Sequence, residues 1–235
     1  MNSSPTAPRR APNDRRKQLP EEVAAYVREL VITGVAKAGD FLRLEPIAEA
    51  VGVSNTPVRE GLLLLQSEGF VQLVPRRGFV VAPFTPGDVE DLFWAQARLG
   101  GELAARAAKR ITPEAIARLE ANIEDYERAA EAGDTDLLAE LGHLFHRELN
   151  LAADSRRLAL LLGTVVKQLP NQFYATIEGQ VDNARAEHPL LLDALKNGDT
   201  RKARSVFERH IQGGAARLIE TLEKRGMWAE GGQTN

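Results

Sequence analysis

Between residues 44 and 81 the spacing of the apolar residues changes from the helical period to that of short strands, and this change restricts the fold more than any other part of the sequence. The segment 44–51 has a helical apolar face and ends at Gly52, a residue suited to the left-handed conformation that often follows a helix. Ser54 can cap a second helix, which continues to Gly69. Two helices three residues apart are typical of a helix-turn-helix.

A helix before this pair and a ribbon behind it complete a larger motif. The preceding helix is expected to begin near Pro20, because proline suits the first turn of a helix. Two β-rich stretches follow the pair at 70–73 and 79–81, and residues 75–78 join them as a hairpin tip. We therefore predict a winged helix-turn-helix over residues 18–83.

The chain after Pro83 shows helical patterns without a competing strand pattern. Thr85 is a start signal for the first of these helices, since Pro86 follows it and Asp88 lies three residues on. The expected helices are 86–110, 113–131, 134–153, 156–178 with a bend at Pro170, 182–197 and 199–225. Amphipathic helices bury their apolar faces by packing on one another, so residues 86–228 are predicted to form an all-α helical bundle.

The predicted fold is therefore mainly α, with an N-terminal winged helix-turn-helix and a C-terminal all-α helical bundle. Aromatic residues make up only 6% of the chain and Ala and Leu dominate, which favours helices over sheets. Residues 1–17 are predicted to form a disordered basic arm, which either adds phosphate contacts or is a solvated tail. Residues 229–235 are expected to be a frayed tail.

Composition excludes several classes of protein. The absence of cysteine excludes disulfides and thiolate metal sites and favours a reducing compartment. The sequence contains no run of about 18 apolar residues and its N-terminus lacks the apolar core of a signal peptide, so we expect a cytoplasmic protein with no membrane partner. The net charge of −3 combines 11 Lys and Arg against 9 Asp and Glu in residues 1–80 with 19 against 24 in residues 81–235. This balance is compatible with nucleic-acid binding, which depends on the local field.

The start of the second helix of the pair carries side chains suited to DNA. Its free N–H groups and small hydroxyls can hold phosphates, Asn55 can read an adenine edge, and Arg59 can reach a guanine or a phosphate. In the alternative, structural interpretation, Ser54 only caps the helix and Arg59 pairs with Glu60 or Glu68. The residues expected to contact DNA, including the hairpin tip, are Arg43, Ser54, Asn55, Thr56, Arg59, Arg76, Arg77 and Gly78.

Several stretches of this region form a specific combination. They are Leu44-Glu45, Ile47-Ala48, Val53-Ser54-Asn55-Thr56-Pro57-Val58-Arg59-Glu60, Leu65, Glu68-Gly69-Phe70-Val71 and Pro75-Arg76-Arg77-Gly78-Phe79-Val80-Val81. With them, residues 27–81 resemble the N-terminal domain of the GntR family of bacterial transcription regulators. The resemblance implies a homodimer on a pseudo-palindromic double-stranded DNA operator. The family usually has Arg where this chain has Asn55, so the operator is expected to differ at the base that this residue reads.

The second half carries a looser set of landmarks. Arg98 and Glu102 lie in its first helix, and Phe145-His146, Glu187-His188 and His210 follow. Over residues 86–222 they resemble the all-helical effector domain of the FadR-type (FCD) subgroup. The resemblance implies a domain for dimerisation and for binding a small carboxylate effector.

In many such domains one Asp and three His bind a divalent metal. Here the resemblance implies a site at His146, His188 and His210, whose imidazoles suit zinc or nickel. The Asp expected one turn before His146 is replaced by Gly142, and His143 lies nearby. Without the resemblance the three histidines have the spacing of ordinary core or surface residues.

Arg98 is the effector-binding candidate, because it lies in an otherwise apolar stretch and can clamp a carboxylate with two hydrogen bonds. It can equally form a structural pair with Glu102, one turn later. Lys167, Asn171 and Arg185 are further candidates to face a cavity, and the sequence does not discriminate among them.

The sequence therefore predicts a ligand-responsive DNA-binding transcription regulator, and not an enzyme. The resemblance favours a repressor whose operator affinity changes when the bundle binds a small organic acid, with a divalent metal in the site. One alternative is a metal-dependent hydrolase, although the chain lacks a Gly-rich phosphate loop and the Gly-x-Ser-x-Gly and His-Glu-x-x-His motifs. The other is a helical protein-interaction module with an appended winged helix.

Overall fold

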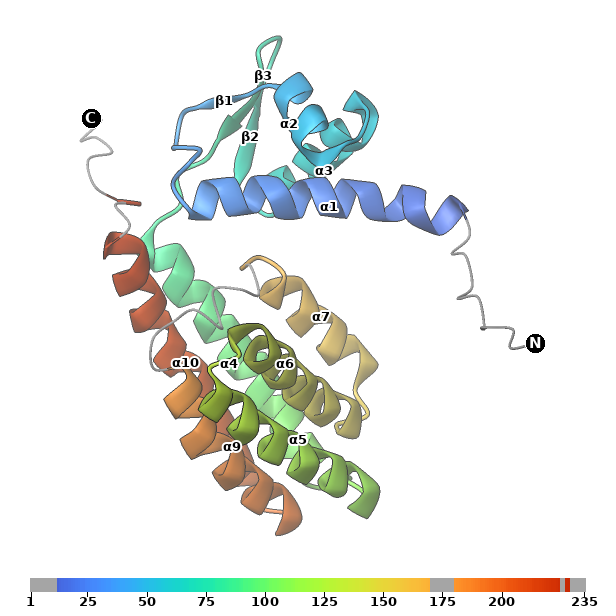
Figure 1. Ribbon diagram of the computed structural model, residues 1–235, viewed down its shortest axis with the longest axis vertical. Coiled ribbons are helices and arrows are strands. Elements are labelled where there is room, and N and C mark those ends of the chain that lie inside the picture. Colours follow the sequence, from blue (N-terminus) through green and yellow to red (C-terminus); the bar gives the residue numbers. More distant parts are fainter. Residues whose placement is uncertain (1–11, 170–179, 225–226, 229–235) are drawn as a thin grey trace. The chain divides into compact units, whose positions relative to one another are not determined.

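The structure, a computed structural model, describes residues 12–169, 180–224 and 227–228 (Figure 1). The chain divides between Phe84 and Thr85 into two compact units, named here the N-terminal unit and the C-terminal unit. The predicted fold class is confirmed, since a winged helix-turn-helix precedes an all-helical unit. No helix in the described part of the chain has the length and apolar character needed to cross a membrane.

The N-terminal unit contains the predicted pair of helices and ribbon. Its elements are α1 (Pro12–Ile32), β1 (Phe41–Leu42), α2 (Leu44–Val51), α3 (Asn55–Ser67), β2 (Val71–Val74) and β3 (Gly78–Val81). Gly52 ends α2 in the left-handed region, with a φ of 73°, as the sequence predicts. The core comes from apolar faces of the three helices and the sheet, including Val27, Ile47, Leu62, Leu65 and Phe79.

Helix α1 begins at Pro12, well before the predicted start near Pro20, and Pro20 lies inside it. A proline inside an isolated helix costs about 3 kcal/mol. Here the carbonyl oxygen of Pro20 faces α3 so closely that a methyl group added to Gly61 would lie 2.7 Å from it. The predicted start near Pro20 was wrong, because the packing of α1 on α3 outweighs the free-energy cost of a proline inside the helix. Residues 1–11 of the predicted basic arm lie outside the described residues.

The sheet has three strands, whereas the sequence predicts two. Its order is β1-β3-β2, and both pairs are antiparallel. β2 and β3 form the predicted ribbon, with Leu73 opposite Phe79. The added strand β1 is only two residues long, and Phe41 lies opposite Val80. A strand of this length has no periodic signal, so it was missed.

The C-terminal unit is built of helices packed as a bundle (Figure 1). Its elements are α4 (Pro86–Ala107), α5 (Pro113–Ala132), α6 (Thr135–Ala152), α7 (Arg156–Val166), α9 (Gln180–Lys196) and α10 (Thr200–Lys224). The predicted start of α4 is confirmed, since the Thr85 side chain accepts from the Asp88 N–H and the Asp88 carboxylate accepts from the Thr85 N–H. Local capping chemistry thus determines where α4 begins.

Helix α7 ends at Val166, although the sequence predicts a helix over 156–178. Residues 167–169 form a turn before Pro170, because the residue before a proline disfavours the helical conformation. The predicted helix is therefore interrupted at residues 167–169. The rest of the predicted segment, 170–179, lies outside the described residues.

The most extensive helix pair in the bundle is α4 with α10. Gly100 of α4 permits this contact, because a methyl group there would lie 2.1 Å from Cε1 of Phe207 on α10. The ring of Phe207 is buried, so it has little freedom to move away. The core around this pair includes Phe93, Leu103, Leu195, Val206 and Leu218.

We predict that Gly100→Ala destabilises the C-terminal unit by about 1–3 kcal/mol, the usual cost of overpacking a core. Gly163→Ala is the matched control, since no atom lies within 4 Å of the added methyl group and the helix should be stabilised by up to about 1 kcal/mol. Urea denaturation followed by circular dichroism measures both changes. Equal stability of the two variants would contradict the packing argument.

Candidate functional site

The start of α3 presents its polar residues to solvent. Ser54 has the extended conformation of an N-cap residue, and its side chain makes no capping hydrogen bond. Asn55, Thr56 and Arg59 are exposed, whereas Pro57 on the same helix is buried. Ser54 therefore occupies the N-cap position, as the structural interpretation expects, but its hydroxyl does not cap the helix and remains available to a ligand.

The tip of the β2–β3 ribbon carries the predicted basic residues. Arg76 has a φ of 65° and Gly78 a φ of 100°, so both adopt the left-handed conformations that close the turn. Arg77 is exposed, and its guanidinium lies 5.1 Å from the centroid of the Phe41 ring. The sequence reasoning missed Phe41, because β1 had not been predicted.

Four exposed arginines among the described residues of this unit have no acidic partner. Within the described ranges, Arg43, Arg59, Arg76 and Arg77 form no ion pair, and Glu68 instead binds the guanidinium of Arg28 at 2.5 Å. The alternative pairing of Arg59 with Glu60 or Glu68 is therefore wrong. Cations without a protein partner are available to phosphates and base edges.

In the C-terminal unit the three predicted histidines converge from three positions on α6, α9 and α10. His146, His188 and His210 each offer one ring nitrogen, and these nitrogens lie within 4.8 Å of one another. The ring centroids are 5.0–5.5 Å apart. His188 and His210 are each only 2% exposed. The helices thus bring together residues that are far apart in sequence, and the set resembles the imidazole ligands of a transition-metal site.

The ring nitrogens of this cluster fit a metal ion. The buried Nε2 atoms of His146 and His188 have no hydrogen-bond partner among the described residues. A buried polar nitrogen without a partner is costly, and a metal would satisfy it. The ring of His188 stacks on Phe145 with centroids 4.0 Å apart, which fixes the direction of its nitrogens.

Glu187 fixes the third imidazole. Its Oε2 lies 3.3 Å from Nδ1 of His210, and its Oε1 accepts from Nε of Arg209 at 2.7 Å. The hydrogen bond to His210 lowers the pKa of Glu187, and Arg209 acts in the same direction. An ionised carboxylate only accepts, so Nδ1 of His210 donates, and in the neutral ring Nε2 keeps its lone pair for an ion. A carboxylate behind a ligating histidine is a common way to orient it.

Burial keeps two of the imidazoles neutral. It lowers the pKa of His146 to about 3, and nearby His210 and His143 act in the same direction. Burial likewise lowers the pKa of His188 well below its ordinary value, followed by the effects of His210 and His146. Metal ligation needs neutral imidazole, so these rings are in the binding form at neutral pH.

The histidines line a cavity of about 530 Å³ within the C-terminal unit. Its walls are mostly apolar, with Phe93, Leu138, Leu162 and Phe207 among them. This volume lies in the range of ligand sites in proteins. The arrangement can hold an ion at the imidazoles and an apolar molecule beside it.

Sequence reasoning missed the polar residues of this cavity. Arg147, Asn150, Ser155 and Arg156 line it, and the buried Oδ1 of Asn150 has no partner within the described ranges. A signal existed for Asn150, which follows His146 by four residues and so shares its face of α6. Ser155 and Arg156 lie at the start of α7, where no sequence motif distinguished them.

Gly142 lines the same cavity one turn before His146, where the resemblance leads one to expect an Asp. A β-carbon at this position would meet only Cε2 of Tyr126, at 3.9 Å, which is an ordinary contact. A larger side chain therefore has room here. His143 also lines the cavity, although it is exposed.

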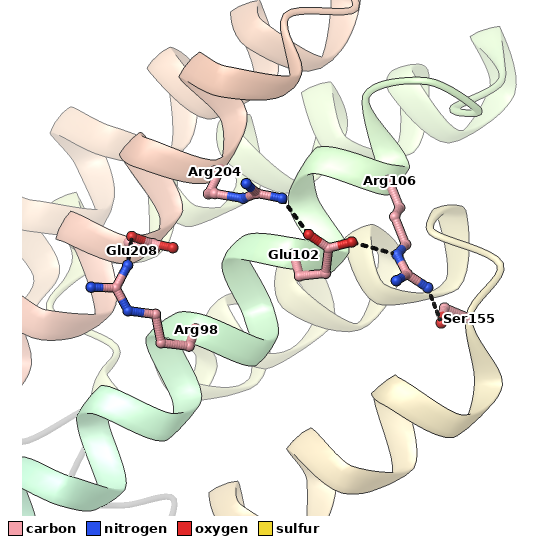
Figure 2. A network of polar contacts seen from close by, with 6 residues as sticks. All are labelled: Arg98, Glu102, Arg106, Ser155, Arg204 and Glu208. Carbon is pink, nitrogen blue, oxygen red and sulfur yellow. Dashed lines mark hydrogen bonds and ion pairs between the residues drawn. The ribbon is translucent and has the colours of Figure 1, made fainter.

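Arg98 does not line the cavity, which corrects the sequence expectation. Its side chain is 51% exposed, and NH1 binds Oε2 of Glu208 at 2.5 Å (Figure 2). The alternative pair with Glu102 is also absent, because Glu102 binds Arg106 and Arg204 instead. Helix α4 is half buried, so a side chain on it can face either the core or the solvent. The apolar residues around Arg98 in the sequence did not show that its side chain faces the solvent.

Glu102 and Arg106 of α4 form polar contacts with α10 and with the residue that precedes α7 (Figure 2). Glu102 accepts from Arg106 of its own helix at 2.8 Å and from Arg204 of α10, and Arg106 donates to the Ser155 hydroxyl at 2.9 Å. The hydrogen bond from Arg106 is the main cause that lowers the pKa of Glu102. The start of α7, which borders the cavity, is thus tied to α4 and α10.

The remaining candidates are placed as follows. Arg185 binds Glu127 on the surface and does not line the cavity. Lys167 is exposed, outside the cavity wall. Asn171 lies outside the described residues.

Comparisons with known proteins agree with this organisation. Residues 19–81 match the bacterial regulatory proteins of the gntR family, and residues 91–213 match the FCD domain. An uncharacterised HTH-type transcriptional regulator of Agrobacterium vitis is 31% identical over 131 residues, which cover 54% of this chain and 77% of that protein. The HTH-type transcriptional regulator McbR of Escherichia coli is 28% identical over 203 residues, 81% of this chain and 88% of McbR.

A solved structure of E. coli McbR/YncC has the same fold. It aligns with a TM-score of 0.64 at 24% identity and covers 86% of this chain and 98% of that one. A GntR family member from Pseudomonas syringae aligns with a TM-score of 0.52 at 20% identity and covers 88% of this chain and 89% of that one.

We predict that the metal-free C-terminal unit loses stability as the pH falls from 6.5 to 5. An unfolded histidine binds a proton near its ordinary pKa of 6.5, whereas folded His146 does so only near 3 and folded His188 is likewise shifted down. The unfolded state then binds more protons, so acid favours unfolding by up to about 1.4 kcal/mol per pH unit for each histidine. Denaturation in the presence of a chelator measures this slope.

The control separates these histidines from other titrating groups. A His146→Gln/His188→Gln variant should show a flatter slope between pH 6.5 and 5 than the wild type. Glu102 and Glu187 titrate below this window, since their pKa values are lowered from 4.5. A slope unaffected by the double substitution would argue against buried neutral imidazoles.

Proposed function

The chain belongs to the GntR family of bacterial helix-turn-helix transcriptional regulators and carries an FCD domain, and from this premise we propose that it is a repressor controlled by an organic acid. The acid would bind the C-terminal unit together with a divalent metal. The observation that carries this proposal is the convergence of three imidazoles in a largely apolar cavity. The family gives no support to the alternatives of a hydrolase or an interaction module.

The amino end of α3 would enter the major groove of the operator. Asn55 would hydrogen-bond an adenine edge, and Arg59, one turn on, a guanine or a phosphate. Ser54 and Thr56 would hold phosphates at the helix terminus. The exposure of these side chains supports this assignment.

Three further basic residues would hold the duplex in register. Arg76 and Arg77, with Gly78, would place the ribbon tip at the adjacent minor groove or backbone, and Arg43 would bind a phosphate. One winged helix makes few contacts, so a homodimer would bind two halves of a pseudo-palindromic site.

His146, His188 and His210 would hold the metal, with zinc or nickel as the suitable ions. Bound there, the ion would supply a positive charge and open coordination positions for a carboxylate. Glu187 would orient His210, and the positive charges of Arg147 and Arg156, which line the cavity, would attract the anionic acid.

The acid would act by shifting a population of conformations. It can change operator affinity only as far as it binds one arrangement of the dimer better than the other. The ties from Ser155 through Arg106 and Glu102 to α10 give the cavity wall a physical connection to the rest of the unit. Release of the operator on binding would make the protein a repressor relieved by its effector.

We predict that the purified full chain retards DNA from upstream of its own gene, and that Arg59→Ala weakens this binding about 5- to 150-fold, the loss of one good base contact. Arg128→Ala, which removes an exposed arginine paired with Asp125, is the control and should bind as the wild type does. Mobility shifts with specific and scrambled DNA measure both. Equal retardation of the scrambled DNA would reject sequence-specific binding.

A further inference from the structure

We infer that the metal and the acid bind the C-terminal unit cooperatively, because the chain supplies three neutral ligands for the ion and no anionic one. This inference rests on the proposed function. It adds how the two occupants depend on each other and which class of acid the cavity takes.

The charge of the cluster is the first argument. Among the described residues the group that could hold an ion consists of His146, His188 and His210, without a carboxylate. Glu187, the acidic residue that touches the cluster, is engaged by Nδ1 of His210 and by Nε of Arg209. A divalent ion there would place two uncompensated charges in a buried site, which is costly unless an anion joins it.

The space beside His146 is the second argument. Gly142 lies one helical turn before His146 and lines the cavity, and a β-carbon there would find only Tyr126 at 3.9 Å. An acidic side chain in this position would reach toward the imidazoles. Its absence leaves that space to a carboxylate brought by the ligand.

The walls of the cavity indicate the class of acid. Phe93, Leu138, Leu162, Phe207 and Ile211 are among the apolar residues that line it. A volume of about 530 Å³ exceeds what an acid of two or three carbons fills. The ligand is therefore a monocarboxylate with an apolar aliphatic or aromatic body.

The test titrates Zn²⁺ into the metal-free full chain by calorimetry, alone and with octanoate, phenylacetate or lactate. Octanoate or phenylacetate should lower the Kd for Zn²⁺ by about tenfold or more, as expected for coupled sites, and lactate should have a smaller effect. By reciprocity, Zn²⁺ should increase the affinity for the same acid by the same factor. Equal Zn²⁺ affinity with and without every acid, or no Zn²⁺ binding, would overturn the inference. A larger effect of lactate would overturn the apolar class.

Gly142→Asp tests the role of the missing carboxylate. It should bind Zn²⁺ more tightly than the wild type without acid and should lose most of the dependence on acid. Gly87→Asp is the matched control, since it adds the same charge at an exposed glycine of the same unit that does not line the cavity and has room for a side chain. If both variants bind Zn²⁺ equally, the inference is wrong. If Zn²⁺ and the acid bind cooperatively but leave the retardation of operator DNA unchanged, the proposed regulation is refuted and the inference stands.

A separate observation identifies Phe41 as a positioning residue for the ribbon tip. The structure assigns it this role because its side chain is 46% exposed, contributes little to the core, and lies 5.1 Å below the guanidinium of Arg77. The pairing of Phe41 with Val80 fixes the ring on the same sheet that carries Arg77 at its turn. A cation held over an aromatic face loses less freedom on binding DNA than a free one.

The test compares operator affinities in mobility shifts. Phe41→Ala should weaken binding about two- to fivefold, the effect of one exposed cation–π contact, and Phe41→Trp should retain wild-type affinity. Leu73→Ala, which removes another exposed apolar residue of the sheet, should bind as the wild type does. In an Arg77→Ala background, Phe41→Ala should have no further effect. An unchanged affinity of Phe41→Ala, or a loss that adds to that of Arg77→Ala, would overturn the assignment.

Discussion

The close packing of α4 on α10 at Gly100 determines where the chemistry of the C-terminal unit lies. Because Gly100 has no side chain, the ring of Phe207 lies against α4, and the centroid of this ring is 5.5 Å from that of His146. His210 follows Phe207 by three residues on α10, so helical geometry turns it to the same side. The absence of a side chain at Gly100 is thus needed to bring the histidines together. The cavity and its histidines lie around the contact between Gly100 and Phe207.

Much of the fold could be predicted because its determinants are local. The Thr85 capping box and the left-handed Gly52 are short-range chemistry that a sequence displays directly. The start of α1 and the strand β1 could not be predicted in this way. Pro20 stays helical because of its contact with α3, and Phe41 becomes a strand residue because β3 offers an edge, and neither partner is near in sequence.

The residues of the candidate site also differ in whether local sequence could predict them. The imidazole positions on three helices followed from a family resemblance, whereas spacing alone gave no reason to group them. Arg98 was expected inside the cavity and lies outside it, because an apolar neighbourhood in sequence does not give the direction of one side chain on a half-buried helix. Asn150 shares a helix face with His146 and could have been found from the helical period.

Helix α7 is held more weakly than the other walls of the cavity. Ser155 at its start makes no capping bond through its side chain, Leu162 is its buried residue, and Leu160 and Leu161 are more than half exposed. A helix with so little apolar area in the core separates from its neighbours at a low free-energy cost. We expect bulky molecules to enter and leave the bundle by displacement of α7, so the dwell time of a bound acid would depend on how firmly Arg106 anchors this one wall.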